Sequence, residues 1–249
     1  MRGVAAVGGV LVVMGAVAGC GAGDVEGAPV EKKAFAFSGD ALVVDSDDSD
    51  LVITPADVED VRVERQVDGW VFLGSGPEAE WQLVDGRLTL RVDCDGVASA
   101  CGALHRIQVP RRVAVSVESE NGDVTAEGFG TPLRVRSDNG DVRVRKASRP
   151  LDLGSENGDL VVEGGTTSAE VVARSSNGDM DVTLGAVPRR VDLAGENGDL
   201  TVSLPRATYD VTGGTDNGDR VIDVPVRQGS GHAVSVRSDN GDVMVRTVN

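Results

Sequence analysis

The triplet Asn-Gly-Asp occurs seven times in the second half of the chain, and its copies are spaced by 18, 18, 20, 20, 20 and 23 residues. A fixed period of this size is typical of repeat proteins, in which each unit buries its apolar face against its neighbours. Asn and Gly tolerate positive φ, so each pair can turn the chain sharply. The predicted structural turns are Asn121-Gly122-Asp123, Asn139-Gly140-Asp141, Asn157-Gly158-Asp159, Asn177-Gly178-Asp179, Asn197-Gly198-Asp199, Asn217-Gly218-Asp219 and Asn240-Gly241-Asp242.

Short segments of alternating character flank each turn. In one repeat, Leu133-Arg134-Val135-Arg136 precedes the turn and Val142-Arg143-Val144-Arg145 follows it. Apolar and polar residues that alternate between turn formers predict half-buried strands. Each repeat is therefore a strand, a tight corner, a second strand and a looser return. This part of the chain is predicted to be all β.

Two all-β architectures fit the repeat. In a single-domain β-solenoid (β-helix), each repeat of about 18–20 residues is one coil, and the Asn side chains pack in a hydrogen-bonded column. In an antiparallel hairpin-repeat fold, each Asn-Gly is a hairpin turn, for which it is the strongest short-range pattern. The constant period and the Asp after every Gly favour the solenoid. Residues 41–54 resemble a degenerate copy, with Asp48-Ser49 in place of Asn-Gly.

The N-terminus has the pattern of an export segment. Met1-Arg2 is followed by an uncharged apolar run that ends at Val17-Ala18-Gly19-Cys20. A short basic start, an apolar stretch and small residues at its end are typical of a signal peptide. The ending resembles the bacterial lipobox, which implies that Cys20 is lipidated and becomes the first residue of the mature protein. The alternative is an ordinary secretory signal with an incidental cysteine.

These features divide the chain into three parts. Residues 1–19 are predicted to be a lipoprotein signal peptide, and residues 20–33 a lipid anchor and linker without periodicity. Residues 34–249 form the β-solenoid domain, with an irregular part at 34–110 and regular repeats at 111–249. The irregular part contains Trp70, Phe72 and Trp81, which predict either a cap on one solenoid end or an exposed aromatic binding site.

Cys94 and Cys101 are the only cysteines besides Cys20. An even remainder in an oxidising compartment predicts a disulfide between them. Closing this eight-residue loop would stabilise the fold by roughly 2.5 kcal/mol. A zinc site is the alternative, although two thiols without neighbouring histidines are a poor ligand set.

The combination of a lipobox, an irregular β segment, Val109-Pro110 and repeated Asn-Gly-Asp resembles the bacterial putative-adhesin family of unknown function. The resemblance covers roughly residues 35–246. It implies a β-solenoid on a surface or membrane-associated protein, and the family supplies no catalytic residues to transfer.

The charge of the chain limits its partners. A formal net charge of −16 argues against nucleic-acid binding, which needs basic patches. The two histidines, His105 and His232, lie in no recognisable nucleophile, zinc or phosphate motif. We therefore expect no catalytic residues and no cofactor. The predicted role is non-catalytic binding or structure at the cell envelope, on the extracytoplasmic side, with an envelope protein or polysaccharide as partner.

The acidic residues of the repeats raise two alternatives to a purely structural or binding role, namely a calcium site and an enzyme. Coils stacked about 4.8 Å apart would align the Asp carboxylates after each Gly in a ladder of like charges. Either turn amides hydrogen-bond these carboxylates, which we expect, or calcium binds between them, with Asp179 and Asp199 as the candidate ligands. An envelope polysaccharide-modifying enzyme on a β-helix is the alternative function. Paired acids in an open groove near unpaired aromatics would favour the enzyme, and acids tied into turns would favour the binding module.

Overall fold

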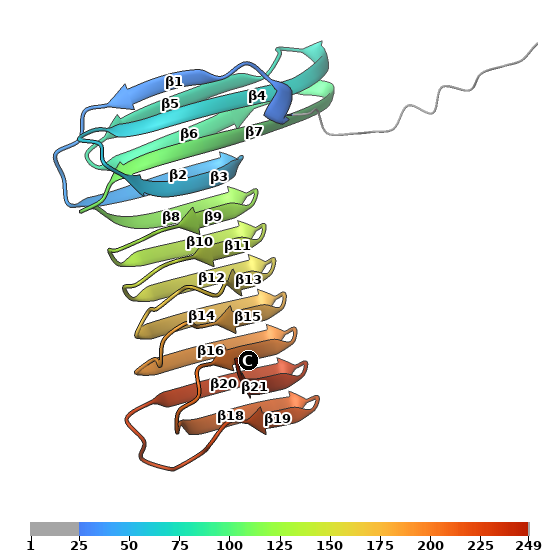
Figure 1. Ribbon diagram of the computed structural model, residues 1–249. Helices are drawn as coiled ribbons and strands as arrows, with labels where there is room; N and C mark the ends of the chain where they lie inside the picture. Colours follow the sequence, from blue (N-terminus) through green and yellow to red (C-terminus); the bar gives the residue numbers. More distant parts are fainter. Residues whose placement is uncertain (1–24, 249) are drawn as a thin grey trace, which may run out of the picture.

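A computed structural model of the chain describes residues 25–248. They form an elongated column of two β-sheets lying face to face, with successive coils of the chain stacked along the column (Figure 1). The repeats pair in parallel: Val135 lies opposite Leu153 of the next repeat, and Asn139 lies opposite Asn157. The β-solenoid prediction is confirmed. The antiparallel hairpin-repeat alternative is wrong for the repeats, because each strand pairs with its equivalents in other coils.

The two sheets contain all the strands of the described residues. In spatial order, the first sheet contains β1 (Glu31–Phe35), β4 (Val61–Gly74), β7 (Gly96–Pro110), β3 (Asp50–Ala56), β9 (Val124–Glu127), β11 (Val142–Arg145), β13 (Leu160–Val162), β15 (Met180–Thr183), β17 (Leu200–Leu204), β21 (Val243–Thr247) and β19 (Arg220–Asp223). The second contains β18 (Asp210–Asn217), β20 (Ala233–Asn240), β16 (Arg190–Asn197), β14 (Glu170–Asn177), β12 (Leu151–Asn157), β10 (Leu133–Asn139), β8 (Ala114–Asn121), β2 (Ala41–Asp48), β6 (Arg87–Asp93) and β5 (Glu78–Val84).

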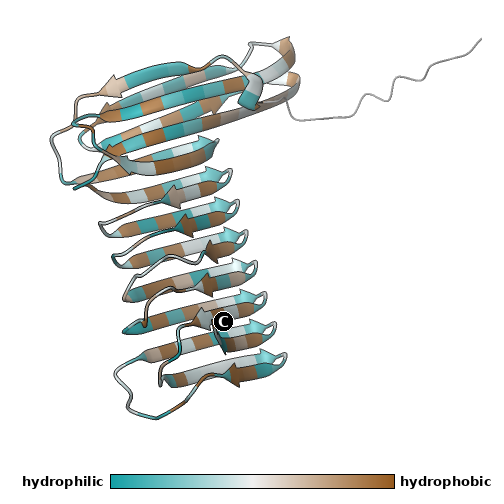
Figure 2. Cartoon of the chain, viewed as in Figure 1, coloured by the Kyte–Doolittle hydropathy of each residue, from teal (hydrophilic) through white to brown (hydrophobic). Residues whose placement is uncertain are grey.

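The core follows from the period-two alternation. Val135, Val144, Leu153 and Val162 point between the sheets and are fully buried, while the arginines between the valines face solvent. Figure 2 shows the resulting bands of hydrophobic and hydrophilic residues, which repeat from coil to coil. Each coil is too thin to bury its apolar side chains alone, so stacking on its neighbours completes the core.

The register stays constant although the repeats differ in length. Every Asn in the column lies opposite the Asn of the adjacent coil. The return loops absorb the difference, with five residues at 146–150 and seven at 163–169. The degenerate copy is also a coil: β2 and β3 flank its corner, and Asp48 lies opposite Asn121.

The last two coils do not follow the order of the sequence. β20 pairs with both β16 and β18, and β21 pairs with both β17 and β19. The chain therefore runs past one coil position, forms the terminal coil at β18–β19, and returns to fill the gap with β20–β21. Asn240, the last Asn of the repeats in sequence, therefore has neighbours on both sides, and Asn217 occupies the end of the column.

The irregular end begins earlier than expected. Residues 20–33 were predicted to be linker, but β1 starts at Glu31 and pairs antiparallel with β4, and a 3-10 turn, η1 (Val25–Gly27), precedes it. The described part of that segment belongs to the fold. The antiparallel strands β1, β4 and β5 cover this end of the column, which agrees with the predicted cap. Trp81 of β5 contributes to it by packing edge-on against Phe35, with 6.3 Å between ring centroids.

β4 and β7 extend beyond the line of corners (Figure 1). Residues 68–74 of β4 pair with residues 96–102 of β7, from Asp68 opposite Gly102 to Gly74 opposite Gly96. We call these two paired segments the finger. Trp70 and Phe72 lie on the finger and are exposed, unlike Trp81.

Candidate functional site

The Asn-Gly-Asp corners stack along one edge of the column, which we call the corner edge. The Asn side chains form one continuous ladder along it. Nδ2 of Asn139 donates to Oδ1 of Asn121 at 3.1 Å, and Nδ2 of Asn157 donates to Oδ1 of Asn139 at 3.1 Å. The pattern continues to Asn217, and at the other end Asn121 donates to the Asp48 carboxylate at 2.8 Å. The hydrogen-bonded column is confirmed. The expectation that the Asn side chains are packed was wrong, because they lie exposed on the outside of the corner.

A second ladder runs beside the first. The backbone N–H of Asp141 donates to Oδ1 of Asp123 at 2.9 Å, and that of Asp179 donates to Oδ1 of Asp159 at 2.8 Å. The equivalent bonds elsewhere in the column measure 2.7–2.9 Å. Each carboxylate except that of Asp219 in the terminal coil therefore receives an amide from the adjacent coil, which compensates for the proximity of like charges. Turn amides do hydrogen-bond the Asp carboxylates, as we expected, but the donor belongs to the adjacent coil and not to the same turn.

Glycine is required at the corner for two reasons. Gly140 has a φ of +136°, where side chains are strongly disfavoured. A Cβ at that position would also lie 2.2 Å from the carbonyl oxygen of Gly122 in the adjacent coil. The close approach allows the Gly122 N–H to donate to the Asn139 carbonyl at 3.0 Å. The triplet is thus a stacking device in which all three residues bond to the neighbouring coil.

A buried hydroxyl column lies behind the Asn ladder. The residue two positions before each Asn is Ser in most coils, and its side chain points inward: Ser119, Ser137, Ser155, Ser175 and Ser238. Oγ of Ser238 donates to the Gly198 carbonyl at 3.1 Å. The Oγ atoms of Ser155 and Ser175 have no partner among the described residues. The recurrent Ser was visible in the spacing of the repeats, but an inward-facing column was not predicted from it.

His105, which lies in no recognisable sequence motif, is a buried group. Its side chain is fully buried, and Nδ1 lies 3.0 Å from Oγ of Ser49, which lies 2.7 Å from Oγ of Ser46. Burial, with a smaller contribution from the charge of Arg65, lowers the pKa of His105 to about 4. The imidazole is therefore neutral at pH 7. His232, by contrast, is partly exposed, and its Nδ1 lies 2.8 Å from the Pro188 carbonyl.

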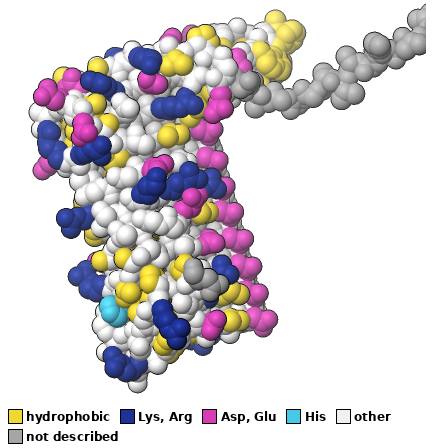
Figure 3. Space-filling model, viewed as in Figure 1, with side chains coloured by type: hydrophobic (Ala, Val, Ile, Leu, Met, Phe, Trp, Pro, Cys, Tyr) yellow, Lys and Arg dark blue, Asp and Glu magenta, His cyan; other side chains and the backbone are white. Residues whose placement is uncertain are grey.

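Acidic side chains dominate the corner edge. Figure 3 shows them as a stripe that runs the length of the column. In the sequence, one carboxylate follows each corner Gly, and a second set precedes Asn, namely Glu120, Asp138, Glu156, Glu196, Asp216 and Asp239. Among the described residues, no group of three or more His, Cys, Asp or Glu side chains is placed to hold a metal ion. Asp179 and Asp199 instead accept amides from adjacent coils at 2.8 and 2.7 Å.

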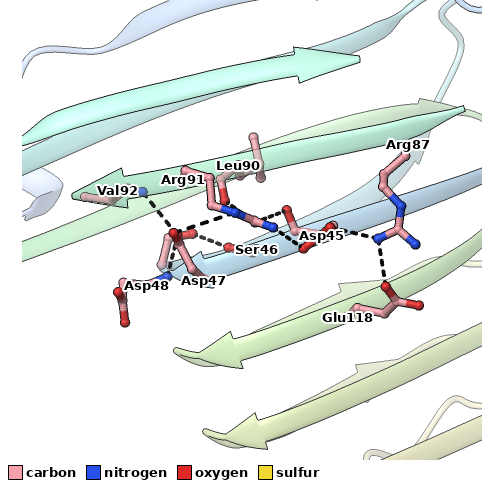
Figure 4. A network of polar contacts seen from close by, with 10 residues as sticks. Asp45, Ser46, Asp47, Asp48, Arg87, Leu90, Arg91, Val92 and Glu118 are labelled. Carbon is pink, nitrogen blue, oxygen red and sulfur yellow. Dashed lines mark hydrogen bonds and ion pairs between the residues drawn. The ribbon is translucent and has the colours of Figure 1, made fainter. Parts of the chain in front are cut away.

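Ion pairs cover the outer face of the second sheet near the cap. Arg87 bridges Asp45 and Glu118 at 2.8 Å each, and Arg91 binds the other oxygen of Asp45 at 2.8 Å (Figure 4). Burial raises the pKa of Asp45, but the bonds and charges of Arg91 and Arg87 outweigh it and hold the pKa below its ordinary value. This network ties β2, β6 and β8 together. All of its charges are paired, which is the arrangement of a structural cross-link rather than of a catalytic pair.

The corner edge meets the finger at a shallow open depression of about 690 Å³. Asp50, Asn121 and Asp123 line its lower side, and Glu26 and Arg106 line its upper side, where they form an ion pair of 3.7 Å. Above it, Cys94 and Cys101 form the expected disulfide, with 6.4 Å between their Cα atoms. Cys20 lies outside the described residues. None of the described helices is long and apolar enough to cross a membrane.

These features define a class of protein: an elongated, parallel β-solenoid with a ladder-bonded corner edge and an antiparallel cap. The chain belongs to the Toastrack DUF4097 family, whose pattern matches residues 103–246. That stretch contains all seven Asn-Gly-Asp corners. No curated protein matches the sequence.

Solved structures of low identity resemble this one. A putative adhesin from Bacteroides fragilis is 13% identical with a TM-score of 0.48, and the match covers 88% of this chain and 97% of the other. A putative cell adhesion protein from Clostridium sporogenes is 11% identical with a TM-score of 0.39, covering 88% and 99%. A putative adhesin from Parabacteroides merdae is 13% identical with a TM-score of 0.37, covering 90% and 98%. Likeness at this level carries no argument about function.

Proposed function

We propose that the protein is a lipid-anchored, extracytoplasmic component of the cell envelope with a non-catalytic binding or structural role. The observation that carries the non-catalytic role is the Asp ladder. Every ladder Asp from Asp123 to Asp242 is hydrogen-bonded to an adjacent coil. Its carboxylate accepts the backbone N–H of the neighbouring Asp, or its own N–H donates to the neighbouring carboxylate. Acids used in this way stabilise a column and leave a regular acidic edge for contact with a partner.

The anchoring part of the proposal rests on the sequence Val17-Ala18-Gly19-Cys20. Two covalently attached acyl chains hold a protein firmly at a bilayer, because each buried methylene contributes to binding. The Cys94–Cys101 disulfide is compatible with an oxidising compartment outside the cytoplasm. A rigid column fixed at one end would hold its acidic edge away from the membrane, where an envelope protein or polysaccharide can reach it.

Fractionation and capture test the two parts separately. Cys20→Ser should move the protein out of the membrane fraction or leave the precursor uncleaved, and unchanged processing and fractionation would contradict lipidation. Capture from envelope extracts should recover a partner with the native protein. If that partner contacts the acidic edge, a variant with Glu120, Asp138 and Glu156 changed to Gln or Asn should recover less of it, and higher salt should weaken capture by the native protein.

A further inference from the structure

The end of the finger exposes a group of large apolar side chains. Trp70 is 56% exposed, Phe72 58%, Leu73 72% and Val97 77%. Figure 3 shows hydrophobic side chains gathered where the finger projects from the column. Contiguous exposed apolar side chains on a soluble domain commonly mark a contact with a protein or a membrane. We call these four residues the apolar tip.

Apart from Asp68 at its base, the finger also lacks charged residues. Residues 69–77 and residues 96–104 contain no Asp, Glu, Lys or Arg, in a chain of which 26% is charged. The two runs lie side by side, since Trp70 pairs with Ala100 and Phe72 with Ala98. The alternation of the strand places Trp70 and Phe72 on the same face. Beyond Asp68 at its base, both strands of the finger therefore present an uncharged surface.

The N-terminal end of the described chain is fixed beside the finger. Nε2 of Gln66 in β4 donates to the carbonyls of Glu26 and Ala28, at 2.8 and 3.0 Å. Val25 lies directly over Gly102, where a Cβ would come within 2.7 Å of its Cγ2 atom. The chain that leads back to Cys20 thus leaves the domain at the base of the finger.

The distance from that point to Cys20 is short. Cys20 precedes Val25 by five residues, which span at most about 18 Å when fully extended. The finger between Gly102 and Gly96 spans six residues, or about 20 Å. A lipid on Cys20 is therefore confined to the neighbourhood of the finger, and the membrane that holds it lies within reach of the apolar tip.

We propose that the apolar tip inserts into the interface of the bilayer that holds the Cys20 lipid, so that the protein stands on two membrane contacts. The proposal rests on the lipid anchoring proposed above. Trp is enriched at membrane interfaces, and Phe and Leu side chains supply the apolar area for insertion. Insertion would fix the tilt of the column and hold its acidic edge in one orientation to the membrane, which a lipid anchor alone cannot do.

Fluorescence of Trp70 tests the insertion. The chain has two tryptophans, so Trp81→Phe in the full chain leaves Trp70 as the only one and keeps an aromatic ring against Phe35. The processed protein is reconstituted into phosphatidylcholine vesicles with or without bromine on the acyl chains. Bromine should quench Trp70 roughly twofold or more, because quenching requires contact with the acyl region where an inserted Trp resides. Adding Phe72→Ser and Leu73→Ser should abolish most of the quenching.

A matched control and the other outcomes make the test decisive. Val226 is 54% exposed, and Val226→Ser, made alongside Trp81→Phe, should leave the quenching unchanged. Thermal melts check that each variant is folded. Lipidated protein with unquenched Trp70 would overturn the proposal and leave the anchoring intact. Missing lipid on Cys20 by mass spectrometry would overturn the anchoring, and quenching with added vesicles would then still support insertion. A vesicle-free dimer with a blue-shifted Trp70 would assign the tip to a second copy and overturn the proposal.

Discussion

Substitution of a corner glycine tests the stacking device directly. Gly178 has a φ of +143°, and a Cβ there would lie 2.2 Å from the carbonyl oxygen of Gly158 and 2.6 Å from its carbonyl carbon. Ordinary contact begins near 3.4 Å, so Gly178→Ala must push the two coils apart by about 1 Å. The displacement would strain the bonds that cross the corner, including Gly158 N–H to the Asn177 carbonyl at 2.9 Å and the Asp179 N–H to the Asp159 carboxylate at 2.8 Å.

The cost can be worked out from these contacts. Holding Ala at positive φ costs about 1–3 kcal/mol. Two lost hydrogen bonds add about 1 kcal/mol each. Gly178→Ala should therefore destabilise the protein by about 3–5 kcal/mol, which for a chain of this size lowers Tm by roughly 6–20 °C.

Substitution of two other glycines separates the cost of positive φ from the cost of the clash between coils. Gly229 has a φ of +74° with nothing within 4 Å of a Cβ, so Gly229→Ala should cost only the backbone term, about 1 kcal/mol. Gly76 has open space and no positive φ, so Gly76→Ala should leave Tm nearly unchanged. Thermal and urea denaturation followed by circular dichroism measures all three variants. If Gly178→Ala melts within a degree or two of Gly229→Ala, the coils do not approach as closely as described and the reasoning is wrong.

Three further predictions follow from the ladders, the buried histidine and the coil order. Asn177→Ala loses a donor and an acceptor between two coils, so it should cost about 1–2 kcal/mol, and Asn217→Ala at the column end about half as much, in urea midpoints. The pKa of His105 is lower in the folded protein than in the unfolded chain, so the unfolded chain takes up this proton at a higher pH. The stability of the fold should therefore fall between pH 6.5 and 4, by about 2 kcal/mol at pH 5, and His105→Gln should flatten that part of the pH profile. Truncation after residue 231 removes the internal coil β20–β21, whereas deletion of residues 210–226 removes the terminal coil β18–β19. The truncation should lower Tm more than the deletion, and equal decreases in Tm would contradict the coil order.

The repeats could be predicted because the residues of each corner specify its local structure. Asn139, Gly140 and Asp141 specify a sharp turn, and the alternation of Val142 and Val144 specifies which side of the strand is buried. Nearest-neighbour stacking then requires no long-range information beyond the period. The same local logic identified the degenerate corner at Asp48, whose carboxylate accepts the last Asn amide of the ladder.

The cap and the burial of single polar groups could not be predicted in this way. His105 lies in an alternating strand where a surface position and a core position differ by one residue, and only the pairing of β7 with β3 and β4 settles its side. β1 reads as linker because only its last residue, Phe35, is buried, and its place depends on pairing with β4 thirty residues later. The Asn ladder is exposed because its side chains lie on the outer side of the turn, and the triplet alone does not specify that side.

The displaced terminal coil has a consequence for the time course of assembly. A solenoid ordinarily adds coils in the order in which its chain appears, each new coil finding its docking surface already complete. Here β18 and β19 appear before β20 and β21, on which they dock. The open surface of β16 and β17 must accept β20 and β21, and a nascent chain that paired β18 with β16 first would have to release it. The last step in stacking these coils is therefore an insertion, and it waits until β20 and β21 have emerged.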